Sequence, residues 1–257
     1  MSEEPRGVVD TGGVRRRDLL RGALAAAAGV GFAGATGNVA WGAPPTRYLI
    51  GRSVRDRPIF AFLMGREDAS EVYLALGQMH GDERAGVGVT RSKLLRMDPP
   101  NHVALWVIPT MNPDGHARDR RTNANGVDLN RNFPSRDWVR QGQGTRFYSG
   151  PKPMSEPETR VVKEFLDDVR PRTIVSIHQP LACVDYSGGT RSVTDWLADA
   201  LDLPARRLGS SGGNMTKWYN DKYPAKTAVT LELPPSTTEA YRRRVAQVLI
   251  RHAASRR

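Results

Sequence analysis

The amino-acid sequence predicts a single α/β domain built on a mixed, mostly parallel sheet that is flanked by helices. Short apolar runs alternate along the chain with longer segments of helical periodicity, which is the pattern of an α/β domain. The chain after residue 43 shows no internal repeat and no linker, and it is long enough to bury one substantial core.

Six apolar runs are expected to form strands, and four segments are expected to form helices. The expected strands are Arg47–Ile50, Pro58–Met64, Glu71–Leu76, Val103–Pro109, Thr173–Ile177 and Ala228–Leu231, and the expected helices are residues 84–97, 156–169, 191–202 and 237–253. Two of the helices are expected to begin at capping boxes, Ser155-x-x-Glu158 and Ser236-x-x-Glu239. Residues 112–153 lack periodicity, and such a stretch inside a compact domain is usually functional or disordered.

Residues 1–43 resemble a twin-arginine export signal, and residues 44–257 are expected to form the folded domain. The run Arg15-Arg16-Arg17 precedes two leucines and an uncharged stretch rich in Ala and Gly, with small residues suitable for cleavage near Ala35 or Ala43. We therefore expect an exported protein without a permanent membrane span. The alternatives are a membrane-spanning helix, which the many glycines disfavour, and an uncleaved signal anchor.

The net charge is +11, and much of the positive charge lies near the carboxyl end, in Arg242–Arg244 and in residues 251–257. No basic groove interleaved with aromatic residues is visible, so nucleic acid is not an expected partner. Val245, Val248 and Leu249 form an apolar stripe, which indicates that these arginines are the solvated face of a packed helix. Attraction to anionic cell-envelope polymers is an additional hypothesis. The single cysteine excludes an intramolecular disulfide.

A histidine and a glutamate that follow an apolar strand are the first indication of a metal site. The run Val72–Leu76 leads into a segment in which His80 and Glu83 stand at i and i+3, so both side chains point the same way on a helical turn. Zinc binds neutral imidazole and carboxylate, and catalytic zinc often has two His and one Glu as ligands. A lone His-x-x-Glu pair is weak evidence, so a third ligand is required.

His178 is the preferred third ligand. It ends the apolar run Thr173–Ile177 much as His80 follows its own strand, and such a pair fits a parallel sheet whose carboxyl ends line a site. As an isolated residue, His178 would more often be a satisfied strand-end histidine than a ligand. The remaining histidines lie at a turn, beyond a Pro-Asp-Gly turn and in the arginine-rich last helix, and they are His102, His116 and His252.

Glu232 is the candidate base that a hydrolytic zinc site needs for its water molecule. It stands at the end of the apolar run Ala228–Leu231. A buried glutamate has to be paired or functional, because an isolated charge is costly there. An ion pair with one of the many arginines is therefore an equal alternative from these residues alone.

Five motifs extend this pattern over most of the chain. In order, they are His80-Gly81-Asp82-Glu83, Asn112-Pro113-Asp114-Gly115, Gly126-Val127-Asp128-Leu129-Asn130-Arg131-Asn132-Phe133, Ser176-Ile177-His178 and Leu231-Glu232-Leu233. The chain resembles, in these motifs and their order, zinc carboxypeptidases of the carboxypeptidase A type. Segments Phe147–Pro151, Ser155–Thr159 and His178–Cys183 look closer still to bacterial murein peptide amidases, short members that cleave the amide between γ-D-glutamate and diaminopimelate in cell-wall peptides.

The resemblance implies roles for particular residues of a zinc peptidase domain that covers residues 44–257. It assigns one zinc ion to His80, Glu83 and His178, with Glu232 as the general base. Arg121 matches the arginine that polarises the scissile carbonyl, and Asn130 and Arg131 match the pair that grips the free carboxylate of a peptide substrate. A planar guanidinium suits both tasks. Without the motifs, both arginines would be interpreted as ordinary surface charge.

The resemblance also implies cis peptide bonds at Gln179–Pro180 and Pro234–Pro235. A departure from the family lies at Leu208, where members usually carry a mobile tyrosine, and Tyr219 or Tyr223 is a candidate to replace it. Specificity is expected to depend on residues near Met215 and Thr216. Asp185 is either a partner for a substrate amine or a solvated aspartate.

The preferred function is that of an exported zinc metallopeptidase which hydrolyses an amide bond next to a residue with a free carboxylate. A general metallocarboxypeptidase and a non-catalytic cell-wall peptide-binding relative are the alternatives. A serine hydrolase built on Gly209–Gly213 and His252 is disfavoured, since Leu203–Arg207 is not the buried strand that a nucleophile elbow requires.

Overall fold

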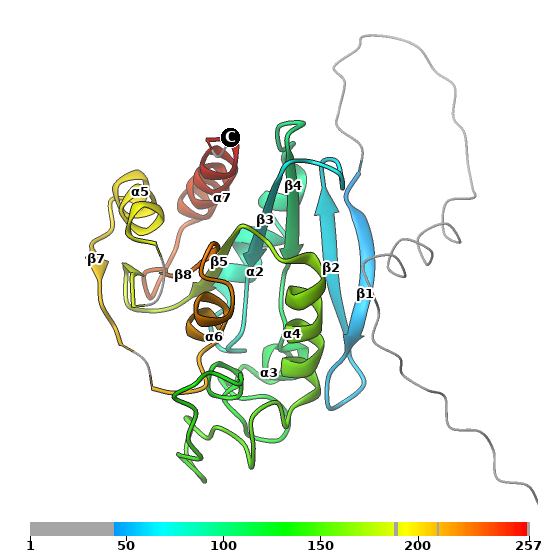
Figure 1. Cartoon of the computed structure of the whole chain (residues 1–257), viewed down its shortest axis with the longest axis vertical. Coiled ribbons are helices and arrows are strands. Elements are labelled where there is room, and N and C mark those ends of the chain that lie inside the picture. Colours follow the sequence, from blue (N-terminus) through cyan, green and yellow to red (C-terminus); the bar gives the residue numbers. More distant parts are fainter. Residues whose placement is uncertain (1–43, 188–189, 210, 256–257) are drawn as a thin grey trace, which may run out of the picture.

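The computed structural model describes residues 44–187, 190–209 and 211–255, and its centre is an eight-stranded sheet of order β1-β2-β4-β3-β5-β8-β6-β7 (Figure 1). The strands are β1 (Thr46–Arg52), β2 (Pro58–Met64), β3 (Glu71–Leu76), β4 (Val103–Ile108), β5 (Thr173–His178), β6 (Cys183–Asp185), β7 (Ala205–Arg206) and β8 (Thr227–Glu232). Strands β4, β3, β5 and β8 are parallel neighbours, as are β6 and β7, whereas β1–β2, β2–β4 and β6–β8 are antiparallel. The predicted mixed sheet is confirmed.

Helices cover both faces of this sheet. They are α2 (Ala85–Thr90), α3 (Pro113–Arg118), α4 (Pro157–Val169), α5 (Arg191–Leu201), α6 (Met215–Lys222) and α7 (Glu239–Ala254), with 3-10 turns η1 (Leu94–Arg96) and η2 (Leu129–Arg131). Along β3, Tyr73 and Ala75 pack in the core under α2, α5 and α7, while Leu74 and Leu76 pack in the core under α4 and α6. Successive side chains of a strand point to opposite faces, so a central strand with two covered faces is apolar throughout.

The helix expected at residues 84–97 is shorter than predicted. Helix α2 ends at Thr90, and only the 3-10 turn η1 follows within that range. The helix contains Gly86 and Gly88, which are poor helix formers, and Gly86 packs against the carbonyl of Gly77, where a Cβ would come within 1.6 Å of the oxygen. The glycine at position 86 therefore allows α2 to pack closely on the sheet.

Both predicted capping boxes are wrong. The N-cap of α4 is Glu156, because the hydroxyl of Ser155 donates to the carboxylate of Glu156 at 2.7 Å instead of accepting from the helix. The N-cap of α7 is Thr238, whose hydroxyl accepts from the backbone N–H of Tyr241 at 3.1 Å. In each case the helix begins one or two residues later than the capping pattern indicates.

The helices α3 and α6, the strands β6 and β7 and the 3-10 turn η2 were not predicted. The two strands are too short to show an alternating pattern, and α3 lies within the irregular stretch from 112 to 153. Of the two predicted cis bonds, Gln179–Pro180 is cis, whereas the prediction for Pro234–Pro235 is wrong. The trans form is the lower-energy state of an X–Pro bond.

The predicted export signal lies outside the described residues, so residues 1–43 stay a prediction from the sequence. Within residues 44–187, 190–209 and 211–255, no helix has the length and apolar character needed to cross a membrane.

Candidate metal centre

Three neighbouring parallel strands bring the candidate residues to one edge of the sheet. His178 is the last residue of β5, Glu232 is the last residue of β8, and these two residues are direct partners in the pairing of the strands. His80 follows the end of β3, which pairs with β5 on its other side. The carboxyl ends of the central strands of an α/β sheet commonly form the ligand site.

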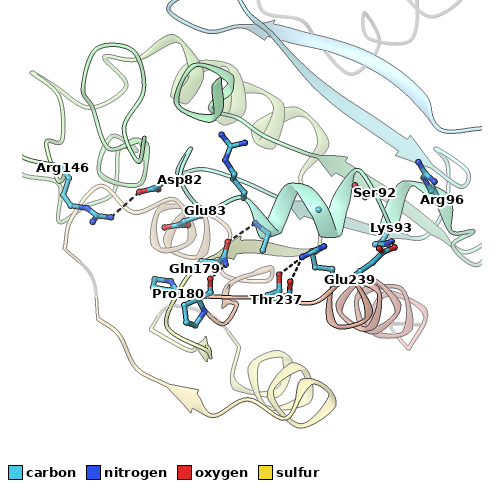
Figure 2. Close-up of a pocket in the computed structure, with 15 residues that line it drawn as sticks. Asp82, Glu83, Ser92, Lys93, Arg96, Arg146, Gln179, Pro180, Thr237 and Glu239 are labelled. Carbon is cyan, nitrogen blue, oxygen red and sulfur yellow. Dashed lines mark hydrogen bonds and ion pairs between the residues drawn. The ribbon is translucent and has the colours of Figure 1, made fainter. Parts of the chain in front are cut away.

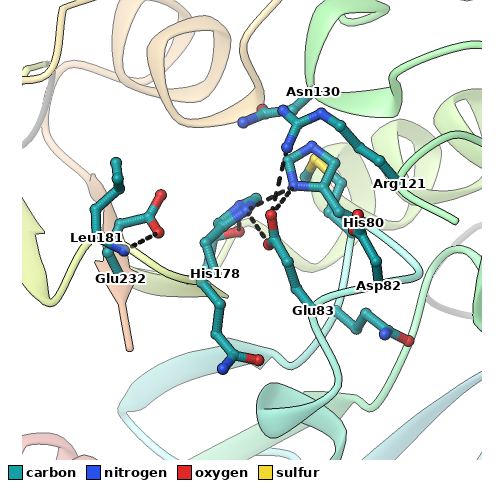
Figure 3. A network of polar contacts seen from close by, with 12 residues as sticks. His80, Asp82, Glu83, Arg121, Asn130, His178, Leu181 and Glu232 are labelled. Atoms are coloured by element: carbon teal, nitrogen blue, oxygen red, sulfur yellow. Dashed lines mark hydrogen bonds and ion pairs between the residues drawn. The ribbon is translucent and has the colours of Figure 1, made fainter. Parts of the chain in front are cut away.

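The side chains of His80, Glu83 and His178 converge, and all three are buried (Figure 3). The Nδ1 atom of His80 lies 2.7 Å from Oε1 of Glu83 and 3.2 Å from Nδ1 of His178, which lies 2.9 Å from Oε2 of Glu83. Tetrahedral ligands at zinc bond lengths lie roughly 3.3–3.5 Å from one another. Two imidazoles and a carboxylate at nearly that spacing form a donor set that fits zinc.

Each imidazole is held by a second partner on its other nitrogen. Nε2 of His80 lies 3.0 Å from Oδ1 of Asp128, which is fully buried, and Nε2 of His178 lies 3.1 Å from the hydroxyl of Ser176. A carboxylate that accepts from Nε2–H fixes the tautomer and leaves Nδ1 free as a metal donor. Asp128 was not among the predicted site residues, although it stands in the third motif and an aspartate between apolar residues is itself a signal.

The charges around His80 and Glu83 stabilise each other. Burial lowers the pKa of His80, but the carboxylates of Glu83 and Asp128 outweigh burial and raise that pKa to about 9. Burial raises the pKa of Glu83, but the two imidazoles outweigh burial and hold that pKa well below its usual range. A proton and a metal ion therefore compete for the Nδ1 atom of His80.

Glu232 is buried beside this cluster and is not part of it. One carboxylate oxygen accepts from the backbone N–H of Leu181 at 3.4 Å, and only 8% of the residue is exposed. Burial, with the nearby charge of Glu83, raises the pKa of Glu232. Among the residues that the structure describes, no cationic side chain forms an ion pair with it, so the alternative of an arginine partner does not hold. A buried carboxylate with a raised pKa suits proton transfer.

Arg121 lies inside the site and not on the surface. Its Nε donates to Oδ2 of Asp128 at 3.0 Å, one terminal nitrogen lies 2.9 Å from the same oxygen, and the other lies 3.4 Å from Oε1 of Glu83. The guanidinium also lies over the ring of Phe147, 5.3 Å from its centroid. Arg121 therefore presents positive charge beside the three donors.

Asn130 and Arg131 lie on the turn η2, and Figure 3 shows Asn130 on the same side of the histidines as Arg121. The side-chain oxygen of Asn130 accepts from the backbone N–H of Met215 at 3.1 Å, which directs the amide nitrogen elsewhere. A terminal nitrogen of Arg131 donates to the carbonyl of Asn130 at 2.8 Å, and burial lowers the pKa of Arg131. The amide N–H₂ and the guanidinium are thus neighbouring donors for an anion.

Other candidate residues do not reach the site. The hydroxyl of Tyr219 donates to the carbonyl of Pro171, and that of Tyr223 donates to Asp167, so neither tyrosine replaces the missing one. Asp185 is buried and accepts from the backbone N–H groups of Ser187 and Leu208 and from the Ser187 hydroxyl, so it is not a solvated aspartate.

The serine-hydrolase alternative also lacks its base. His252 is buried on α7, where its Nδ1 atom lies 3.2 Å from the hydroxyl of Tyr73 and its ring packs against Trp196. The proposed nucleophile segment includes Ser210, which lies outside the described residues.

Comparison with known proteins agrees with this geometry. The zinc carboxypeptidase family profile matches residues 45–194. Murein peptide amidase A of Escherichia coli K12 is 34% identical over 209 residues, which cover 76% of this chain and 84% of that protein.

Solved structures show the same fold. The crystal structure of murein-tripeptide amidase MpaA from Escherichia coli O157 superposes with a TM-score of 0.70 at 29% identity, covering 82% of this chain and 92% of that one. Carboxypeptidase A from Helicoverpa armigera superposes with a TM-score of 0.67 at 20% identity, covering 82% of this chain and 69% of that one, and shows the fold alone. These findings make the chain a zinc-dependent hydrolase and a member of the zinc carboxypeptidase family.

Proposed function

We propose that the protein is an exported zinc metallopeptidase that cleaves the amide bond between γ-D-glutamate and diaminopimelate in cell-wall peptides. The observation that carries the proposal is the convergence of the donors of His80, Glu83 and His178 at the edge of the sheet that also holds Glu232. The choice of substrate is supported by the identity with murein peptide amidase A over most of both chains.

His80, Glu83 and His178 are the residues that would hold zinc, and zinc would polarise the amide carbonyl and make water more acidic. Glu232 takes the proton of the attacking water, which its raised pKa favours, and returns it to the departing amine. Arg121 stabilises the negative charge that develops on the carbonyl oxygen, because its guanidinium already lies beside Glu83.

Asn130 and Arg131 define the substrate end that is released. Their amide and guanidinium groups can donate together to one carboxylate, and a charge-assisted pair of this kind gives orientation as well as affinity. Diaminopimelate carries a free carboxylate next to the amide nitrogen of this bond. A residue of this kind, held by Asn130 and Arg131, would have its amide bond at the metal donors. Met215 fixes the amide orientation through its backbone N–H, so the predicted influence of this region on specificity has a physical basis.

Export is the second part of the proposal and is supported by the sequence of residues 1–43 alone. Amino-terminal sequencing of the protein recovered outside the cytoplasm, from cells with and without a twin-arginine pathway, tests it. Cleavage near Ala35 or Ala43 that depends on this pathway is expected. Full-length protein retained inside both cell types would contradict it.

The activity is tested by mass spectrometry of the products released from L-Ala-γ-D-Glu-diaminopimelate and, in parallel, from ordinary peptides with free carboxyl ends. We expect release of diaminopimelate by the zinc-loaded protein, and loss of this release in Glu232→Gln and in a chelated sample. Zinc analysis of Glu232→Gln should show normal metal content, which separates the base from the ligands. Release of ordinary residues only would assign a general carboxypeptidase, and no turnover with zinc bound would favour a peptide-binding protein.

A further inference from the structure

A large cavity opens next to the metal centre, between α2 and α7 (Figure 2). Its volume is about 870 Å³, and Glu83 forms part of its wall. Ligand sites in proteins commonly have volumes of about 300–1,000 Å³. The cavity is therefore large enough to take part of a substrate whose cleaved bond lies at Glu83.

Side-chain bonds fix the wall of this cavity. The amide oxygen of Gln179 accepts from the backbone N–H of Ala85 at 2.9 Å, and its amide nitrogen donates to the carbonyl of Pro234 at 2.9 Å. Gln179 thus joins the start of α2 to the turn that leads into α7, and Figure 2 shows it in the cavity wall. This part of the cavity wall is therefore held by bonds within the protein.

The cavity has an excess of positive charge. Five basic residues and three acidic ones line it, and the acidic residues are Asp82, Glu83 and Glu239. Arg146 lies 3.8 Å from Asp82, and Lys93 pairs with Glu239. Glu83 belongs to the metal centre, and Arg84 pairs with Asp119 outside the cavity. Among the described residues, Arg96 and Arg242 are therefore the lining cations without an ion pair.

Among the basic residues of the cavity, Arg242 has the positively charged side chain that is best fixed in position. One terminal nitrogen donates to the carbonyl and to the hydroxyl of Thr237, at 2.6 and 3.0 Å. Its side chain lies across Gly88 of α2, so closely that a Cβ at Gly88 would come within 2.7 Å of its Cδ atom. Among the described residues no carboxylate forms an ion pair with Arg242, although its charge acts on Glu239. Nε faces Gly88 and one terminal nitrogen is bonded to Thr237, so the other terminal nitrogen is the one available to a ligand.

The position of the cavity indicates which half of the substrate it can bind, the acyl half or the released residue. In Figure 3, Asn130 lies on the opposite side of the two histidines from Glu83, which lines the cavity. If Asn130 and Arg131 hold the released residue, the acyl half runs past Glu83. Gly88 lies in the first turn of α2, which begins two residues after Glu83, and two residues with a short acyl group extend roughly 10–13 Å.

We propose that this cavity binds an anionic group, a carboxylate or a phosphate, at the amino-terminal end of the acyl half, and that Arg242 is its principal ligand. The inference rests on the proposed function, because that function places the cleaved bond at the donors. It means that the preferred substrates are peptides that still carry an acidic group on their amino-terminal side. Free peptides, which carry an ammonium group there, are poorer substrates.

The test uses three substrates that differ only in the charge at this end. They are L-Ala-γ-D-Glu-diaminopimelate with a free amine, with an N-acetyl group and with an N-succinyl group. For the wild type, kcat/KM should rise in that order, with the succinyl form about tenfold better than the acetyl form, as one charge-assisted hydrogen bond provides. In Arg242→Gln this ratio should fall to about one, while in Arg243→Gln, an exposed neighbour on α7, it should stay as in the wild type.

The ratio of two substrates does not depend on the amount of folded enzyme, so partial unfolding of a variant does not obscure it. If Arg242→Gln does not fold at all, Arg242→Lys, which keeps the charge but loses the planar donor pair, should lower the ratio without abolishing it. A succinyl preference that is absent in the wild type, or unchanged in both variants of Arg242, would overturn the proposal.

Binding of the acyl products separates this proposal from the proposed function. N-succinyl- and N-acetyl-L-Ala-D-Glu are titrated into wild type and variants by calorimetry, which needs no turnover. Tighter binding of the succinyl compound that is lost in Arg242→Gln supports the anion site even if no diaminopimelate is released. Equal binding of both compounds refutes the site even if the enzyme cleaves all three substrates.

Discussion

Asp128 is placed to control zinc affinity, and the variant Asp128→Asn tests this. The residue is fully buried, one oxygen lies 3.0 Å from Nε2 of His80, and the other accepts from Nε of Arg121 and lies 2.9 Å from one of its terminal nitrogens. An asparagine keeps the shape but loses the charge, and its N–H₂ group must face one of these donors. The tautomer of His80 is then less well fixed, and Arg121, only 3.4 Å from Glu83, competes more strongly for that ligand.

Loss of such an outer partner typically weakens metal binding about 10- to 100-fold, which corresponds to about 1.4–2.8 kcal/mol. The assay is competition for zinc between the protein and a chromophoric chelator at constant pH. Ser176→Ala is the matched control, because it removes a neutral partner from the other imidazole and should weaken binding less than tenfold. A folded Asp128→Asn protein that binds zinc as tightly as the wild type would refute the reasoning.

Three further predictions follow from other parts of the structure. Because the pKa of His80 is raised to about 9, zinc must displace a proton from His80 below that pH. Zinc affinity should therefore increase with pH by up to about tenfold per pH unit and level off above pH 9, as measured by the same competition assay. Burial raises the pKa of Asp167, but hydrogen bonds from two lysines and a tyrosine outweigh burial and lower it. Above the ordinary pKa of an aspartate the charged form therefore stabilises the fold, and Asp167→Asn should lower the free energy of unfolding by about 1 kcal/mol at neutral pH. This difference should shrink as the pH falls below about 4. Urea unfolding of chelated protein over this pH range measures the difference, and a difference independent of pH would be contrary evidence. Gly213 has φ of +69°, and an added Cβ would lie 1.9 Å from the carbonyl oxygen of Arg131. Gly213→Ala should therefore lose about 1–3 kcal/mol of stability and raise KM more than it lowers kcat. Normal unfolding and kinetics of this variant would show that the contact is not important.

The central strands and the metal donors could be predicted because their signals are local. The ranges of β2 and β3 agree with the expected ones, since a buried strand is a short apolar run with clear ends. His80 and Glu83 share one turn, and His178 ends its own strand, so the spacing and the strand pattern place all three at one edge. The structure brings them together as expected.

What could not be predicted depends on contacts between distant parts of the chain. Helix α2 is shorter than expected and packs closely on the sheet through Gly86 and Gly77, and no local pattern reports that contact. Asp128 is an outer partner of His80 across 48 positions of sequence. Arg242 lines the cavity beside Glu83, whereas the sequence indicates it only as one basic residue of a solvated helix face.

The irregular stretch from 112 to 153 shows how loops can hold a site in a fixed geometry. The side-chain amide of Asn112 donates to the carbonyls of Met79 and Arg121, at 3.1 and 3.2 Å, so one fully buried residue joins the peptide before His80 to that of Arg121. Asn123 accepts from the backbone N–H of Val127 while its N–H₂ group donates to buried carboxylates at the start of α4. Each bond joins a side chain to a backbone group or a carboxylate, so it replaces the regular ladder that these segments lack. A substitution in this stretch should therefore change the distance between the donors and Arg121 before it changes the sheet.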